Sequence, residues 1–163
     1  MKLYLKQKVF SFRDRFTARC ETGEDRFYVE GRVFTLGKQL YVYDASGNEV
    51  AYIRQKLMSW MPRFTIEIGG KEVCTIIQKF QFLKNDYRIE GLPWYLEGDF
   101  VGHEYELIND NQVIMRLSKH WFTWGDSYEL DICEQTSDPD FQELLCLCIA
   151  LAVDAAMCVQ RRG

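Results

Sequence analysis

The residue types that most often carry catalysis are sparse in this chain of 163 residues. It contains two histidines, His103 and His120, and each lies in a segment that resembles a strand. A histidine acts as a base on a nearby serine or cysteine nucleophile, but the Gly-x-Ser-x-Gly turn of many hydrolases is missing from the sequence. We therefore predict two ordinary strand histidines and no catalytic residue. An enzyme with an unrecognised site is the less favoured alternative.

Six cysteines offer metal or redox chemistry, but their spacing does not support either. They are Cys20, Cys74, Cys133, Cys146, Cys148 and Cys158. On a regular helix Cys146 and Cys148 point about 200° apart, so they cannot hold one metal ion together. Neither Cys-x-x-Cys nor His-Glu-x-x-His occurs. We predict reduced, buried thiols, no metal site and no cofactor.

Two segments combine cations with tryptophan, which suits a membrane surface or a lipid headgroup. They are "KLMSWMPR", with Lys56, Trp60 and Arg63, and "SKHWFTW", with Lys119, Trp121 and Trp124. Strand alternation equally places these tryptophans on an inner, packing face. We take Lys56, Arg63 and Lys119 as the candidate headgroup-binding residues.

Composition limits the class of partner and of compartment. The formal net charge is -4 and the pI is about 5.3, which is a poor electrostatic match to nucleic acid. The opening "MKLYLKQKVF" has no continuous apolar stretch, so we expect no signal peptide and a cytoplasmic protein. The length suits one domain, residues 1–163.

Most of the chain has the pattern of short antiparallel strands. Segments such as "QLYVYD" and "RFTIEI" alternate apolar and polar residues, and "ETGED", "ASGN" and "NDN" supply turn residues between them. We count ten to twelve strands. A long sheet with free edges invites aggregation, and closing the sheet into a barrel removes those edges.

The strands also repeat. "YVEGRVFTL" aligns without a gap on "RIEGLPWYL", and "GNEVAYIRQK" aligns on "DNQVIMRLSK", which places Lys56 and Lys119 at matched positions. The offset grows from 60 to 63 residues between the two alignments, as a loop insertion would cause. We predict duplicated β halves near residues 27–68 and 87–132.

The last segment, "LLCLCIALAV" followed by "DAAMCVQRRG", has no polar face. Asp138 and Pro139 are typical of a helix start, so we predict a helix near residues 139–160. A helix that is apolar all round is buried all round, and a barrel of about twelve strands has room for it. A C-terminal membrane anchor is the alternative, which Asp154 disfavours. In the barrel, Asp154 is either a proton-sensitive or ligand-facing group, or it lies near the mouth or pairs with an Arg, Trp or Tyr of the wall.

The stretch "FYVEGRVFTLGKQLYVYDASGNEVAYIRQK", the "LEGDF" sequence and the apolar terminal helix resemble the LURP-one-related family. The resemblance implies a Tubby C-terminal-like or phospholipid scramblase-like fold, which is a closed twelve-stranded antiparallel barrel threaded by a hydrophobic helix. Tubby-like domains can bind phosphoinositide headgroups, but no such residue is matched here.

These observations favour a non-enzymatic binding or scaffold domain. The first hypothesis is recognition of anionic phospholipid at the cytoplasmic membrane face, with the protein peripheral to the membrane. The alternative is a protein-interaction or regulatory module that has no lipid ligand.

Overall fold

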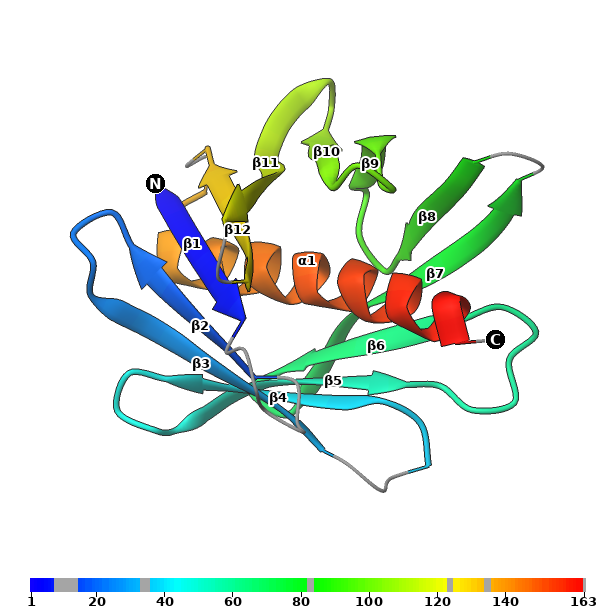
Figure 1. Cartoon of the computed structure of the whole chain (residues 1–163), viewed down its shortest axis with the longest axis horizontal. Coiled ribbons are helices and arrows are strands. Elements are labelled where there is room, and N and C mark those ends of the chain that lie inside the picture. Colours follow the sequence, from blue (N-terminus) through cyan, green and yellow to red (C-terminus); the bar gives the residue numbers. More distant parts are fainter. Residues whose placement is uncertain (8–14, 33–35, 82–83, 123–124, 134–135, 163) are drawn as a thin grey trace.

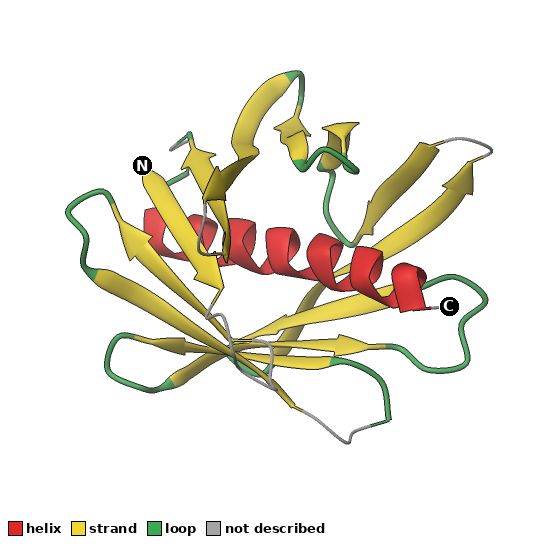
Figure 2. Cartoon of the chain, in the orientation of Figure 1, coloured by secondary structure: helices red, strands yellow, loops and turns green. Residues whose placement is uncertain are grey.

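The structure is a computed structural model, and it describes residues 1–7, 15–32, 36–81, 84–122, 125–133 and 136–162. Twelve strands and one helix account for most of these residues (Figures 1 and 2). The strands are β1 Lys2–Gln7, β2 Arg15–Cys20, β3 Asp25–Arg32, β4 Gln39–Asp44, β5 Glu49–Gln55, β6 Arg63–Ile68, β7 Lys71–Gln81, β8 Lys84–Glu90, β9 Tyr95–Asp99, β10 Glu104–Asn109, β11 Gln112–Phe122 and β12 Gly125–Ile132. The helix is α1, Pro139–Arg162.

All twelve strands belong to one antiparallel sheet that curls around the helix. Its hydrogen-bonded order is β8-β7-β6-β5-β4-β3-β2-β1-β12-β11-β10-β9. Nearly every neighbour in the sheet is therefore a neighbour in sequence, as the alternating segments and short turns predict. The pairing of β1 with β12 brings the two ends of the strand series together. The predicted mainly β, twelve-stranded antiparallel barrel is confirmed.

The barrel is nearly closed rather than fully closed. β8 and β9 stand at the two ends of the hydrogen-bonded order, and no ladder joins them in the described part of the chain. Aromatic packing covers this seam from the inside. The Tyr87 ring on β8 lies 4.8 Å from that of Phe100, and Phe100 lies 5.1 Å from Tyr105 on β10. Side-chain burial thus replaces the missing ladder as the link between the two edges.

The helix fills the barrel and forms the centre of its core. Residues 142–153 and 155–157 are buried without a break, so every face of α1 contacts the wall. By length and composition α1 could cross a membrane, but 83% of its apolar window is buried inside the protein. The structure therefore supports the threaded helix over the membrane anchor. Opposite it, the strands contribute alternate residues such as Leu3, Ile53 and Leu130, which are almost fully buried.

The two pairs of repeated segments fall on corresponding strands. The first pair includes β3 and β8, and the second pair lies on β5 and β11. Between them the second half carries an additional strand, β9, which has no counterpart among the described residues of the first half. The duplication itself stays a prediction.

Candidate functional site

The residues that could do chemistry inside the barrel do not form an open site. Tyr128 of β12 donates a hydrogen bond to Asp154 of α1, with 3.4 Å from Oη to Oδ1. This confirms that Asp154 pairs with the barrel wall. His103 and Tyr105 line the same internal cavity, whose volume of about 10 Å³ is that of a single water site. Burial, followed by the nearby charge of Asp154, raises the pKa of Tyr105 well above its usual range. The cavity is too small for an organic substrate.

The histidine prediction is partly wrong. His103 lies in the turn between β9 and β10, not in a strand, and its φ of 56° is left-handed. Its ring packs 5.5 Å from that of Tyr128. His120 lies in β11 as expected. His103 directly precedes β10, so the segment "VGHEYELI" resembles a single strand although its first three residues form a turn.

The cysteines are all free thiols, as predicted, but only three are buried. Burial raises the pKa of Cys74 and of Cys146 to about 12, and it raises that of Cys148 further. Cys20, Cys133 and Cys158 are only partly buried, which corrects the prediction of six buried thiols. Among the described residues, no group of three or more His, Cys, Asp or Glu side chains is placed to hold a metal ion.

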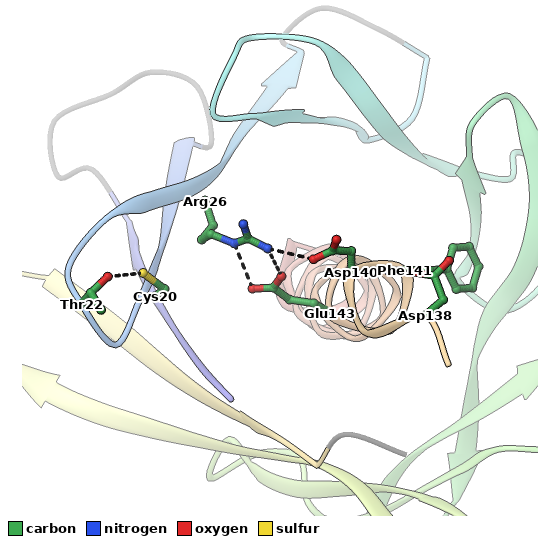
Figure 3. A network of polar contacts seen from close by, with 7 residues as sticks. All are labelled: Cys20, Thr22, Arg26, Asp138, Asp140, Phe141 and Glu143. Carbon is green, nitrogen blue, oxygen red and sulfur yellow. Dashed lines mark hydrogen bonds and ion pairs between the residues drawn. The ribbon is translucent and has the colours of Figure 1, made fainter. Parts of the chain in front are cut away.

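A polar network holds the start of the helix (Figure 3). Asp138 is the N-cap, since its Oδ1 accepts a 3.1 Å hydrogen bond from the Phe141 amide. The guanidinium of Arg26, on β3, lies 2.6 Å from Glu143 Oε2 and 3.3 Å from Asp140 Oδ1. The Glu143 side chain is 0% exposed. Because one strand cation satisfies a buried helix carboxylate, this network fixes the helix in the barrel rather than binding a ligand.

The two ends of the barrel differ in charge. Strands alternate in direction, so the β2–β3, β4–β5, β6–β7 and β10–β11 turns lie on the side of the sheet from which the chain enters the helix. Residues 20–25, 44–49 and 110–111 of these turns include six acidic residues and no Lys or Arg, while the β6–β7 turn is Gly69-Gly70 with Lys71 at the start of β7. The six are Glu21, Glu24, Asp25, Asp44, Glu49 and Asp110. The β2–β3, β4–β5 and β10–β11 turns are therefore uniformly acidic, and we call this side the acidic end.

The opposite end, where α1 finishes, carries a cationic surface on one side. The β3–β4 and β5–β6 connections lie there (Figure 1). We call residues 36–38 and 56–63 the basic rim. It contains Lys38, Lys56 and Arg63 and no acidic residue. A chain of net charge -4 thus presents a local surface of the opposite sign.

The basic rim also exposes large apolar side chains. Met58 and Trp60 are 105% and 99% exposed, and Leu36 is 84% exposed. They are the three most exposed of the large hydrophobic residues that the structure describes. Trp60 therefore lies in solvent, which overturns the inner-face alternative for this tryptophan. Trp124 lies outside the described residues, and only the backbone of Trp121 is described.

The structure brings together two of the three predicted headgroup residues. Lys56 and Arg63 close the same hairpin, and the Lys56 amide donates a 2.8 Å hydrogen bond to the Arg63 carbonyl. Lys56 is exposed, while Arg63 forms a 3.9 Å ion pair with Glu90. An exposed pair at that separation contributes little to stability, so the Arg63 guanidinium is available to an anion.

Lys119 is presented differently, although its position matches that of Lys56 in the repeat. Leu107 pairs with Met115 and Ile108 with Val113, so Ile114 is an extra residue in β11. This bulge shifts the alternation by one position. Lys119 consequently follows Leu117 on the inward face, and its Nζ lies 5.8 Å from the centre of the Tyr128 ring. In the sheet order β11 lies six strands from β5.

Sequence reasoning missed two features of this site. The apolar residues of the rim were part of the quoted segment "KLMSWMPR", but only its tryptophan and cations were singled out. The participation of Leu36 depends on the β4–β5 pairing, which places the β3–β4 connection beside the end of β5. A run of three apolar residues among four in a turn, Leu57 to Trp60, was the available signal.

Comparisons with known proteins agree with this architecture. The chain is 41% identical over 157 residues to the uncharacterised protein YxjI of Bacillus subtilis (strain 168), covering 96% of this chain and 94% of that protein. An X-ray structure of a protein from Arabidopsis thaliana superposes with a TM-score of 0.56, at 13% identity, over 92% of this chain and 91% of that one. At this identity the plant structure supports the fold alone.

The profile of the LURP-one-related family matches residues 1–154, from β1 into the second half of the central helix. This match agrees with the strand order and with the buried helix described above. The chain belongs to the LURP-one-related family.

Proposed function

We propose that the protein is a non-enzymatic binding domain that recognises anionic phospholipid headgroups at the cytoplasmic face of a membrane. The observation that carries the proposal is the separation of charge along the barrel. The basic rim has three cations and no acidic residue, whereas the turns at the other end carry six acidic residues. Such a molecule can approach an anionic surface with one end, despite its negative net charge.

Lys56 and Arg63 are the leading headgroup ligands, because they flank one exposed loop. Lys119 stays the third candidate cation, but it lies on a separate wall near the end of β11 and faces inward over the Tyr128 ring, so it would contribute less than Lys56 and Arg63. A cation near an anionic membrane surface contributes about 1 kcal/mol, so two or three of them give weak, reversible and salt-sensitive binding. This is the behaviour of a peripheral protein.

The test is co-sedimentation with vesicles of phosphatidylcholine, with and without phosphatidylserine, at rising salt. We expect binding to the anionic vesicles that weakens with salt, because surface charges are screened over about 8–10 Å at physiological ionic strength. Lys56→Glu and Arg63→Glu should each weaken binding about fivefold or more without lowering the melting temperature.

Lys71→Glu is the matched control, since Lys71 is an exposed lysine at the start of β7, next to the β6–β7 turn and far from the basic rim along the strand direction. Its charge reversal should leave vesicle binding unchanged. If Lys71→Glu weakens binding as much as Lys56→Glu, net charge rather than the rim controls the interaction.

The second candidate is a protein-binding module with no lipid ligand, which the exposed apolar side chains of the rim, taken without the bordering cations, also support. The vesicle experiment separates the two functions. An absence of binding to anionic vesicles at low salt and high protein concentration would contradict the lipid proposal and leave the protein-binding module.

A further inference from the structure

The loop between β5 and β6 carries a cluster of exposed apolar side chains. Leu57, Met58 and Trp60 follow one another within four residues, and Met58 and Trp60 are fully exposed. Single exposed hydrophobic residues are common on protein surfaces, but contiguous exposed ones mark contact sites. The exposed apolar residues of this loop therefore indicate that it contacts a partner or a membrane.

The backbone of the same loop is held in an unfavourable conformation. Met58 has a φ of 60°, which lies in the left-handed region that glycine and asparagine tolerate and that other residues rarely adopt. At the described turns the left-handed positions are mostly glycines, such as Gly23 and Gly47. At position 58 a long apolar side chain is instead projected into solvent. Strain of this kind is typical of functional positions.

A second loop extends this apolar surface. The Gln55 amide donates a 2.9 Å hydrogen bond to the Lys38 carbonyl, and the Lys38 amide donates a 3.0 Å bond to Gln55 Oε1. A Cβ built on Gly37 would lie only 3.0 Å from Leu57 Cδ2. These contacts fix the β3–β4 connection against the β5–β6 loop, so that Leu36 lies beside the same apolar cluster.

Cations border the apolar side chains within the rim. Lys56 precedes them and Arg63 follows them, while Lys38 comes from the neighbouring connection. Tryptophan is enriched at the membrane–water interface, where its ring lies at headgroup level, and lysine and arginine there reach the phosphates. An apolar tip bordered by cations thus matches the layered structure of an anionic bilayer surface better than it matches a protein surface.

We infer that the β5–β6 loop inserts into the bilayer interface, with Met58 and Trp60 entering between the headgroups and Lys56 and Arg63 contacting the lipid phosphates. This inference rests on the proposed lipid function and adds the apolar anchor and its orientation. The barrel then stands on the membrane with its acidic end, where α1 begins, directed away from the lipid.

The experiment measures both affinity and insertion with phosphatidylcholine–phosphatidylserine vesicles. Met58→Ser and Trp60→Ser should each weaken vesicle binding about tenfold, because each removes a large apolar side chain from the interface. Trp60→Phe should retain most of the affinity. Bromine-labelled acyl chains should quench the tryptophan fluorescence of the bound wild-type protein, and Trp60→Phe should lose that part of the quenching.

Met58→Gly and Phe141→Ser complete the design. Met58→Gly relieves the left-handed strain and removes the side chain, so its melting temperature should not fall while its vesicle binding weakens. A weaker binder that is equally stable excludes misfolding as the cause. Phe141 is an exposed apolar residue at the first turn of α1, at the acidic end (Figure 3), and Phe141→Ser should leave binding unchanged.

The outcomes separate this inference from the proposed function. Salt-sensitive binding that Lys56→Glu reduces, with no quenching of Trp60 and no effect of Met58→Ser, would overturn insertion and leave headgroup recognition standing. An absence of binding to anionic vesicles would overturn both. Equal losses in Phe141→Ser and Trp60→Ser would also overturn insertion, because the loss would then not depend on the loop.

Discussion

At the scale of single residues, the buried carboxylate of Glu143 is the feature that most needs a physical explanation. A charged group that is 0% exposed is strongly destabilising unless it is paired. Arg26 supplies the pairing from β3. The pair joins the helix to the wall at one defined position.

Removing the arginine should therefore destabilise the fold more than its partial exposure suggests. We expect Arg26→Ala to lower the free energy of unfolding by about 2–3 kcal/mol, because it leaves Glu143 buried without its cation. Adding Glu143→Gln to that variant should recover part of the loss. Urea denaturation of the two single variants and the double variant gives the coupling energy.

Asp140→Asn is the control for this cycle, because Asp140 contacts the same guanidinium but is 88% exposed. It should change stability by less than about 0.5 kcal/mol. An Arg26→Ala variant as stable as the wild type would show that Glu143 finds another partner or water.

At the scale of elements, the central helix supplies the core around which the strands fold. Its side chains occupy the barrel interior along almost its whole length, about 36 Å for 24 residues. The wall alone would be a sheet with an apolar inner face and two free edges, at β8 and β9.

A charge in the middle of this helix should prevent normal folding. Ala150 is nearly fully buried, so Ala150→Arg forces a guanidinium into the packed core at a cost of several kcal/mol. We expect an insoluble or molten protein, detected by loss of the cooperative thermal transition. Deletion of residues 139–163 should have the same result.

Ala45→Arg provides the comparison, since Ala45 is an exposed residue in the β4–β5 turn. This variant should melt within a degree or two of the wild type. A thermal transition of Ala150→Arg at the wild-type temperature would instead mean that solvent reaches this face of α1.

At the scale of the whole molecule, burial in the barrel interior raises the pKa values of thiols on separate elements. Cys74 lies on β7 and Cys146 on α1, and burial raises the pKa of each thiol from 9.0 to about 12. In the unfolded chain the same thiols ionise near pH 9. Between these values the unfolded state holds fewer protons than the folded state, so stability is complete below pH 9 and falls as the pH rises.

Alkaline titration should reveal this linkage. We expect the free energy of unfolding to fall between about pH 9 and pH 12, by about 1 kcal/mol per pH unit for each buried thiol. Urea denaturation at several pH values measures the slope. Cys74→Ala combined with Cys146→Ala should reduce the slope, whereas a slope unchanged by these substitutions would assign the alkaline loss to other groups, such as Tyr105.

The separation of acidic and basic residues between the ends of the barrel is also a property of the whole molecule, and it is not visible in the sequence. The acidic turns and the basic rim alternate along the chain, so composition shows only a net charge of -4. Antiparallel folding then collects alternate turns at opposite ends. The difference in charge between the two ends of the barrel can be recognised only after the direction of each strand is known.

The sequence by itself determined the class of fold. The alternation in segments such as "QLYVYD" depends on the two-residue period of a strand, and the uniformly apolar stretch from Leu144 to Val153 requires burial on every side. Both are local signals, so they needed no knowledge of distant contacts. Together they led to a barrel with a helix inside, and the free thiols and the N-cap at Asp138 followed from equally local patterns.

Tertiary structure alone decided the features that depend on register and on distant pairing. The bulge at Ile114 turned Lys119 to the inward face, although its local sequence matches that around Lys56. The partner of Glu143 is 117 residues away, and the seam between β8 and β9 depends on where the last ladder ends. A one-residue shift reverses which side chains face the core, and no local period records it. For the same reason, only the folded chain shows that Leu36 and Trp60 belong to one surface.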